Sequence, residues 1–255
     1  MIVLTSAFVL LSAFSCGGGS KATGTNEQSE KVVVNVPQFD ADSAYLYVKN
    51  QVDFGPRVPN TKEHVACGNY LAGKLEAFGA KVTNQYADLI AYDGTLLKAR
   101  NIIGSYKPES KKRIALFAHW DTRPGSQYWS RNPHVQGYNA RFGILLDMVG
   151  GENSVFLKEG YSEEFAPDIN KKVWKAAKKA GYGKTFIDER GDTITDDHLF
   201  INRLARIKTI DIIPNDPETG FPPTWHTIHD NMDHIDKNTL KAVGQTVLEV
   251  IYNEK

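Results

Sequence analysis

The sequence of 255 residues has little cysteine, no excess of either charge and no hydrophobic run long enough to cross a membrane. Its 30 Lys and Arg residues balance its 30 Asp and Glu residues, so it lacks the sustained basic surface that binding of nucleic acid or of an anionic membrane requires. A composition of 41% hydrophobic and 24% charged residues excludes a disordered chain and a coiled coil. No repeat, low-complexity segment or long linker follows residue 31, so we expect one folded domain over residues 32–255.

The amino-terminal segment differs from the rest of the chain. Residues 2–14 form an apolar run that is too short to span a bilayer and that ends beside Cys16. Residues 17–31 contain almost no apolar residue, which is typical of a flexible tether. The arrangement resembles a bacterial lipoprotein signal, so we expect a signal peptide over 1–16, a lipid at Cys16 and a membrane-anchored protein of the periplasm or cell envelope. Plain secretion is the alternative.

The second cysteine, Cys67, has no partner for a disulfide if Cys16 carries a lipid. It lies in a segment where apolar residues such as Tyr70 and Leu75 recur at helical spacing, and Gly79 follows as a suitable helix C-cap. The pattern predicts a helix over 64–78 and a buried structural thiol.

Near-continuous apolar strands alternate with amphipathic helices along residues 41–255. Helices are expected near 41–51, at 64–78 and 168–180, and after the N-cap residue Asp236; strands are expected near 80–87, 95–105, 113–119, 142–148 and 207–213. This alternation predicts an α/β fold, a three-layer sandwich with a mostly parallel central sheet flanked by helices. In such sheets the functional site lies at the carboxyl ends of the strands.

Polar residues follow the strongest predicted strands at these ends. His119 follows the first strand, Asp147 lies near the end of the second, and Trp225 and His226 follow the third. Imidazole and carboxylate groups are the ligands that zinc prefers among such side chains. Each carboxylate also has a structural reading: Asp147 as a satisfied strand residue, and Asp196 or its neighbour as a helix cap.

Several motifs occur in a fixed order along the chain. They are DFGPRVPN (53–60), NIIG (101–104), AHWDTRP (118–124), LLD (145–147), DDH (196–198) and WHT (225–227). Together they resemble the glutaminyl-peptide cyclotransferases, which belong to the zinc aminopeptidase-like superfamily. The resemblance runs from about residue 40 to the carboxyl terminus.

The resemblance implies a reaction, a metal and residue roles. Family enzymes hold one zinc through an Asp, a Glu and a His, and cyclise amino-terminal glutamine of peptides and proteins to pyroglutamate with release of ammonia. Zinc polarises the γ-carboxamide oxygen while a carboxylate carries a proton from the attacking α-amine to the leaving group. By motif, His226 matches the zinc histidine, Trp225 the wall of the substrate pocket, and Asp147 and Asp196 the aspartates that orient the reacting groups; Trp129 is a further candidate substrate-binding side chain.

One departure from the family pattern bears on activity. The segment expected after Pro124, which carries the zinc aspartate, the zinc glutamate and the general acid/base, is missing, and Gly125 follows directly. A strand-helix-strand unit of this kind takes about 30 residues or more. Of the three zinc ligands only His226 remains, although His119, Asp147 and His226 offer a residual two-histidine, one-carboxylate set.

We therefore expect the cyclase activity to be severely impaired or absent. The alternatives are an inactive scaffold that binds peptide amino termini, a zinc aminopeptidase, and a deletion form that folds poorly. Loss of a central piece of sheet leaves backbone groups and apolar faces without partners, which costs several kcal/mol against a net stability of about 5–15 kcal/mol.

Overall fold

The computed structural model describes residues 34–121, 125–215 and 220–254. Cys16, the tether and Pro124 at the expected deletion lie outside these ranges. The helices are α1 (Ala41–Val52), α2 (Lys62–Ala77), α3 (Ser126–Arg131), α4 (Gly160–Phe165), α5 (Pro167–Lys179), α6 (Asp197–Phe200) and α7 (Lys237–Asn253), with a π-helical turn at Ile201–Ala205 and a 3₁₀ turn at Met232–His234. The strands are β1 (Lys81–Ile90), β2 (Leu96–Ser105), β3 (Ile114–Phe117), β4 (Phe142–Leu146), β5 (Phe156–Lys158), β6 (Phe186–Arg190) and β7 (Thr209–Ile212).

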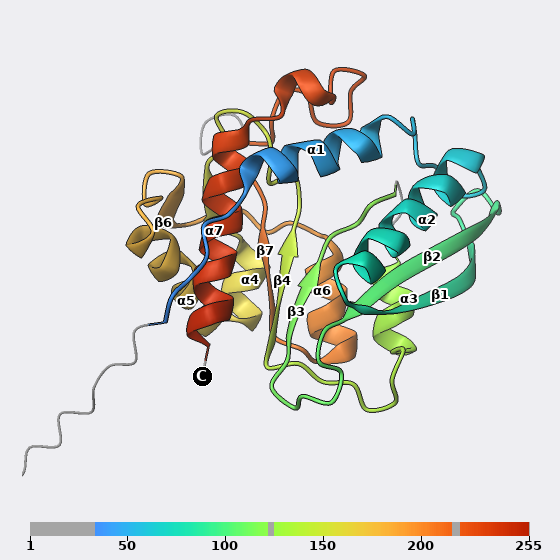
Figure 1. Ribbon diagram of the computed structural model, residues 1–255, viewed down its shortest axis with the longest axis horizontal. Coiled ribbons are helices and arrows are strands. Elements are labelled where there is room, and N and C mark those ends of the chain that lie inside the picture. The colour runs from blue at the N-terminus through green and yellow to red at the C-terminus, as the bar shows by residue number, and fades with distance from the viewer. Residues whose placement is uncertain (1–33, 122–124, 216–219, 255) are drawn as a thin grey trace, which may run out of the picture. The chain divides into compact units, whose positions relative to one another are not determined.

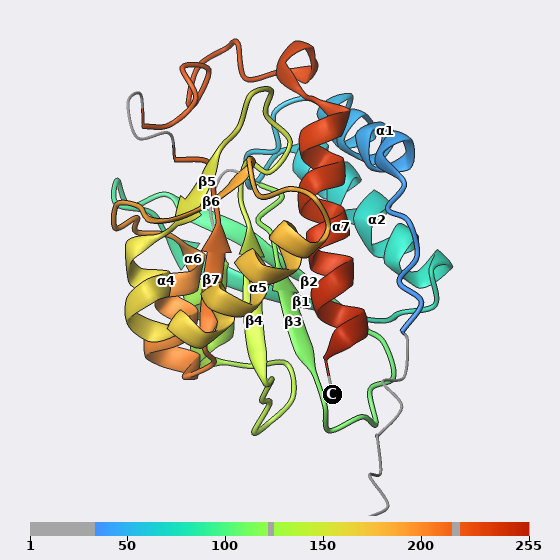
Figure 2. The same cartoon turned by 90° about the vertical axis from the view of Figure 1, so that its left-hand side faces the viewer.

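The strands lie between two layers of helices, which confirms the predicted three-layer α/β class (Figure 1). Figure 2 shows α1, α2 and α7 on one side of the strands and α4 and α6 on the other. No helix among the described residues is both long enough and apolar enough to cross a membrane.

The central strands β3, β4 and β7 are parallel, with β4 in the middle, and Ile144 pairs with Leu116 on one side and with Ile210 on the other. The strands β1 and β2 form a separate antiparallel pair, and β5 and β6 form a parallel pair. A backbone bridge between Phe156 and Pro214 joins the β5–β6 pair to the chain just after β7. Within the described ranges no ladder joins β2 to β3, so the sheet is interrupted there.

The main core lies where α5 and α7 pack on the central strands. The strands contribute Ile144 and Ile210 to this core, and α7 contributes Val243 and Val247. All four side chains are buried. The Asp236 side chain accepts hydrogen bonds from the Asn238 and Thr239 amides at 3.1 Å each, which confirms the predicted N-cap of α7.

The predicted long elements are present, with shifted ends. The expected strands 113–119 and 142–148 stop at Phe117 and Leu146, because the polar residues that follow leave the ladder and turn towards the site. Cys67 is fully buried in α2, and Gly79 follows that helix at φ +84° as predicted. The short elements α3, α4, β5 and β6 were not predicted, since segments of three to six residues are too short to show a hydrophobic period, whereas α6 was indicated by the possible cap at Asp196 or Asp197.

Candidate functional site

The candidate site lies at the carboxyl ends of β3 and β4. His119 follows β3, Asp147 follows β4, and Asp196 and Asp197 lie at the start of α6, beside Ser126 at the start of α3. Parallel strands bring their carboxyl ends to one edge of a sheet, so His119 and Asp147 meet although they are far apart in sequence. The structure thus places these two predicted site residues together at the same edge of the sheet.

His119 is held between two oxygen acceptors. Its Nε2 lies 3.4 Å from Asp147 Oδ1, and its Nδ1 lies 2.9 Å from the carbonyl oxygen of Asp121. Asp121 is itself buried, with Oδ2 at 3.1 Å from Nε2 of the buried His64. The contact with Asp147 raises the pKa of His119 to about 9 against the opposing effect of burial. The imidazolium form, which donates at both nitrogens, is therefore favoured at neutral pH.

The two aspartates of the DDH motif play different local roles. The Asp196 side chain accepts a hydrogen bond from the Asp197 amide and is the N-cap of α6, so the capping role expected as an alternative is present. Asp197 is buried and accepts a hydrogen bond from the Ser126 hydroxyl at 2.6 Å. Burial raises the pKa of Asp197 to about 6 and also raises the pKa of Asp196. The cluster of Asp147, Asp196 and Asp197 around His119 thus combines three carboxylates with one imidazolium.

A second group of titratable side chains is buried beside the start of α6, next to this cluster. His198 is fully buried, with Nε2 at 2.9 Å from Glu159 Oε2 and Nδ1 at 3.4 Å from Asp211 Oδ2. Burial opposes ionisation of Glu159, but the contact with His198 and several hydrogen bonds lower its pKa to about 2. Burial raises the pKa of Asp211 well above its ordinary value. Glu159 and Asp211 thus face the two ring nitrogens of His198, which follows Asp196 and Asp197 at the start of α6.

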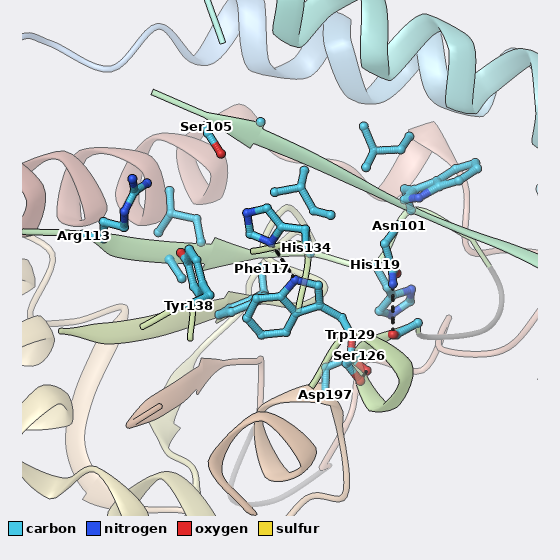
Figure 3. Close-up of a pocket in the computed structure, with 18 of the residues that line it drawn as sticks. Asn101, Ser105, Arg113, Phe117, His119, Ser126, Trp129, His134, Tyr138 and Asp197 are labelled. Atoms are coloured by element: carbon cyan, nitrogen blue, oxygen red, sulfur yellow. Dashed lines mark hydrogen bonds between the residues drawn. The ribbon is translucent and has the colours of Figure 1, made fainter. Parts of the chain in front are cut away.

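A cavity of about 340 Å³ opens next to this cluster, between β2 and β3. His119, Ser126 and Asp197 lie at one end and Arg113 at the other, as Figure 3 shows. Trp129, His134 and Tyr138 lie between the two ends (Figure 3). Trp129 is buried and its Nε1 donates a hydrogen bond to His134 Nδ1 at 3.1 Å, so much of its ring surface belongs to the core.

The structure does not bring Trp225 and His226 into this group. Trp225 is 41% exposed, and its ring stacks on His226 with 4.1 Å between the centroids. His226 has φ +57°, in the left-handed region. Neither residue lines the cavity that Trp129 and His119 share. The two candidate substrate-binding residues Trp129 and Trp225 therefore do not line the same cavity.

The residual zinc set expected from the sequence is not assembled either. Among the described residues no three side chains of His, Cys, Asp or Glu are arranged to hold a metal ion. Both nitrogens of His119 face oxygen acceptors, and His226 lies on the exposed loop. A protein zinc site needs about three ligands, so His119, Asp147 and His226 as placed here do not fit zinc.

The comparison with protein families matches half of the chain to one family. Residues 124–251 match the family described as peptidase family M28. The chain belongs to peptidase family M28. No curated protein matches the sequence.

Solved structures of M28 relatives match nearly all of the folded chain. A Bacteroides thetaiotaomicron glutaminyl cyclase bound to N-acetylhistamine is 76% identical over 87% of this chain and 100% of its own, with a TM-score of 0.85. A leucine aminopeptidase precursor from the same species is 74% identical over 88% of this chain and 100% of its own, with a TM-score of 0.85. A Zn-dependent exopeptidase from Parabacteroides distasonis is 46% identical over 86% of this chain and 100% of its own, with a TM-score of 0.84.

These comparisons make this M28 chain a homologue of glutaminyl cyclases, as the motifs suggested. They associate zinc with the family, through the relative named as Zn-dependent. A missing segment is consistent with the short chain of 255 residues, and within the described residues no ladder joins β2 to β3.

Sequence reasoning missed the supporting residues Glu159, His198 and Asp211 and assigned Asp197 no more than a capping role. The acidic pair Asp196–Asp197 could have indicated a further role for Asp197. Two adjacent carboxylates repel each other, so each needs its own hydrogen-bond donor or positive charge nearby. Glu159 and Asp211 had no comparable signal, since their contact with His198 joins three distant segments of the chain.

Proposed function

We propose that this glutaminyl cyclase homologue binds the amino-terminal residues of Gln-initiated peptides and cyclises them slowly or not at all. The observation that carries the proposal is the convergence of Asp147, Asp196 and Asp197 beside an open cavity. The described residues near that cavity form no zinc ligand set. Three carboxylates against the single positive charge of His119 leave a negative site that suits an α-ammonium group. The named activity of the Bacteroides thetaiotaomicron relative supports glutamine as the preferred first residue.

Cyclisation makes a demand that these residues do not meet. A carbon–nitrogen bond forms between the α-amine and the γ-carboxamide carbon, and ammonia leaves, so negative charge develops on the amide oxygen. In the family zinc supplies the stabilisation of that charge. The described cluster offers three carboxylates, which repel a developing oxyanion, and His119, whose two ring nitrogens already face oxygen acceptors. Binding of the amino terminus is therefore retained while the transition state is poorly stabilised.

The test combines a binding and a turnover measurement. Titration calorimetry with the dipeptide Gln-Ala amide should show saturable binding, and the N-acetylated dipeptide should bind at least tenfold more weakly because it lacks the ammonium group. Ammonia release, with zinc supplied, should stay at least a hundredfold below that of the purified Bacteroides thetaiotaomicron relative. Turnover equal to that of the relative, or failure of the free-amine dipeptide to bind, would each contradict the proposal.

A matched pair of variants separates the site from general charge effects. Asp147→Asn removes one carboxylate of the cluster and should weaken dipeptide binding about ten- to hundredfold, as expected for a lost charge-assisted contact of about 1.5–3 kcal/mol. Asp168→Asn removes a carboxylate that is 56% exposed on α5, where it pairs with Lys208, and should leave binding unchanged. Equal effects of the two substitutions would rule out the cluster as the binding site.

Aminopeptidase activity is the second candidate, because a relative at 74% identity is named a leucine aminopeptidase precursor. Hydrolysis would need an activated water in addition to an anchored amino terminus. Release of 4-nitroaniline from leucine 4-nitroanilide, with zinc or cobalt supplied, measures it directly, and a rate above the buffer blank would favour this candidate over the binding function.

We also propose that the protein is anchored in the cell envelope through a lipid at Cys16, which lies outside the described residues. The apolar run before Cys16 and the polar tether after it support this. The full-length chain should fractionate with membranes, and Cys16→Ser should release it into the soluble fraction. Membrane association of the Cys16→Ser variant would contradict the anchor.

A further inference from the structure

The cavity has two strand edges as its walls. Along the described chain, β2 pairs with β1 on one edge and β3 pairs with β4 on one edge, and neither has a partner strand on its other edge. Residues 99–106, from β2 and its end, and residues 112–121, around β3, line the same cavity. Both walls therefore expose backbone donors and acceptors towards one space, the situation in which an added strand can pair.

Leu116 shows that this side of β3 lacks a cover. It lies in the middle of a strand of the parallel sheet, where both faces are ordinarily buried, yet it is 47% exposed and lines the cavity. Its cross-strand partner Ile144 on β4 is fully buried. On the floor of the cavity, Trp129 and Tyr138 pack edge to face with 5.5 Å between their centroids. The space thus offers apolar contacts to side chains on both faces of an inserted strand.

The two ends of the cavity carry opposite charge. The end beside the α6 start contains Asp197, with Asp196 and Asp147 adjacent. The other end is formed by the connection from β2 to β3, residues 106–113, which contains four basic residues and one acidic residue. Lys112 and Arg113 of that connection line the cavity. A peptide with its ammonium group at the first end and negative charge at the second matches this distribution.

We propose that the cavity between β2 and β3 binds an extended peptide segment as an added strand between them. The amino terminus lies at the carboxylate cluster and the chain runs antiparallel to β3, towards Lys112 and Arg113. This deepens the proposed function and rests on it, because the same amino terminus is the anchor. At about 3.3 Å per residue, walls of eight and ten residues accommodate a segment of roughly seven residues, so affinity depends on peptide length and on a free backbone.

The test uses three peptides that share a free amino-terminal glutamine and a carboxyl-terminal fluorescein label. They are Gln-Val, Gln-Val-Thr-Val and Gln-Val-Thr-Val-Thr-Val-Glu, measured by fluorescence anisotropy with the full folded chain. The seven-residue peptide should bind at least tenfold more tightly than the dipeptide, with the tetrapeptide between them. N-methylation of the third and fifth backbone amides of the seven-residue peptide should weaken its binding at least tenfold, since these amides can no longer donate hydrogen bonds to a strand edge.

A charge-reversal pair tests the direction of the peptide. Lys112→Glu should weaken binding of the Glu-ended peptide several-fold and should strengthen binding of the same peptide ending in Lys. Lys175→Glu, on the exposed surface of α5, makes the same charge change away from the cavity and should alter neither. Both lysines are exposed, so both variants should keep the melting temperature of the unmodified chain.

The outcomes separate this inference from the proposed function. Equal affinity for the dipeptide and the heptapeptide would refute the added strand while leaving amino-terminal binding intact. Heptapeptide binding that survives N-acetylation and still needs free amides would support the strand and refute the amino-terminal anchor. A stable dimer in sedimentation velocity that the heptapeptide does not dissociate would place a second copy on these edges and overturn the proposal.

Discussion

The exposed edge of β3 leads to a quantitative prediction about two leucines on neighbouring strands. Leu145 on β4 is fully buried, whereas Leu116 on β3 is 47% exposed. Replacing a fully buried leucine by alanine costs about 2.7–5.0 kcal/mol of unfolding free energy, because apolar contact is lost and a cavity remains. A leucine that is half in solvent loses about half of a burial term of about 1.5–3 kcal/mol and leaves an open surface rather than a cavity. Leu116→Ala should therefore cost about 1 kcal/mol.

Urea unfolding followed by tryptophan fluorescence measures both variants under one condition. In thermal melts of the same variants, about 1 kcal/mol lowers the melting temperature of a domain of this size by about 2–4 °C. Leu145→Ala should therefore lower it by roughly 5–20 °C and Leu116→Ala by roughly 2–4 °C. The chemical change is the same in both variants, so each is the control for the other. Equal losses would mean that β3 is covered as completely as β4, and the interpretation of the cavity as an uncovered strand edge would be wrong.

Three further predictions follow from other parts of the fold. Gly244→Ala should destabilise the chain by about 1–3 kcal/mol, because an added Cβ would lie 2.3 Å from the Phe39 ring, whereas Gly73→Ala, with nothing within 4 Å, should stabilise it by about 0.5–1 kcal/mol in the same urea assay. The pKa of Glu159 is lowered to about 2 from an ordinary 4.5, so the stability that its ionised form contributes is present above pH 4.5 and is lost as the pH falls towards 2. The Glu159→Gln variant should lose less stability over that pH range than the unmodified chain. An equal loss in both proteins would contradict the ionised state of Glu159. In a Cys16→Ser chain the Cys67 thiol, which is fully buried with a raised pKa, should react with Ellman's reagent only after unfolding, and rapid labelling of the native protein would refute its burial.

The sequence was sufficient for the long elements and for two residues of the site because their signals are local. Asp236 and the apolar residues of α7 recur at helical spacing, and His119 and Asp147 follow apolar strands directly. The rule for parallel sheets then brings those two residues together without knowledge of any contact. The position of Gly79 after α2 was predictable for the same reason, since a helix end with a left-handed residue is a local event.

The remaining site residues depend on contacts between distant segments. Trp129 matched a substrate-binding role by motif, but it is buried beside Phe117 and Tyr138, and the sequence does not indicate which side of its ring faces solvent. His226 matched a zinc ligand by motif. The orientation of its imidazole would be fixed by a bound metal and by ligands from other strands, and the local sequence does not encode it. In the structure His226 stacks on Trp225 on an exposed loop. The His198 cluster combines side chains from α4, α6 and β7, and no local pattern relates them.

Under the proposed function, loss of one segment from the middle of a parallel sheet would separate binding from catalysis, because each strand end supplies its own part of the site. The missing segment takes two expected zinc ligands and the general acid/base with it, but His119, Asp147, Asp196 and Asp197 belong to other elements and remain at the same sheet edge. The same loss leaves the edges of β2 and β3 open beside these residues. We therefore propose that an incoming peptide meets an anchor for its amino terminus and a partner for its backbone in one cavity. The described residues offer the oxyanion of cyclisation only His119, whose two ring nitrogens already face oxygen acceptors. For this reason tighter binding of longer peptides is expected to accompany low turnover.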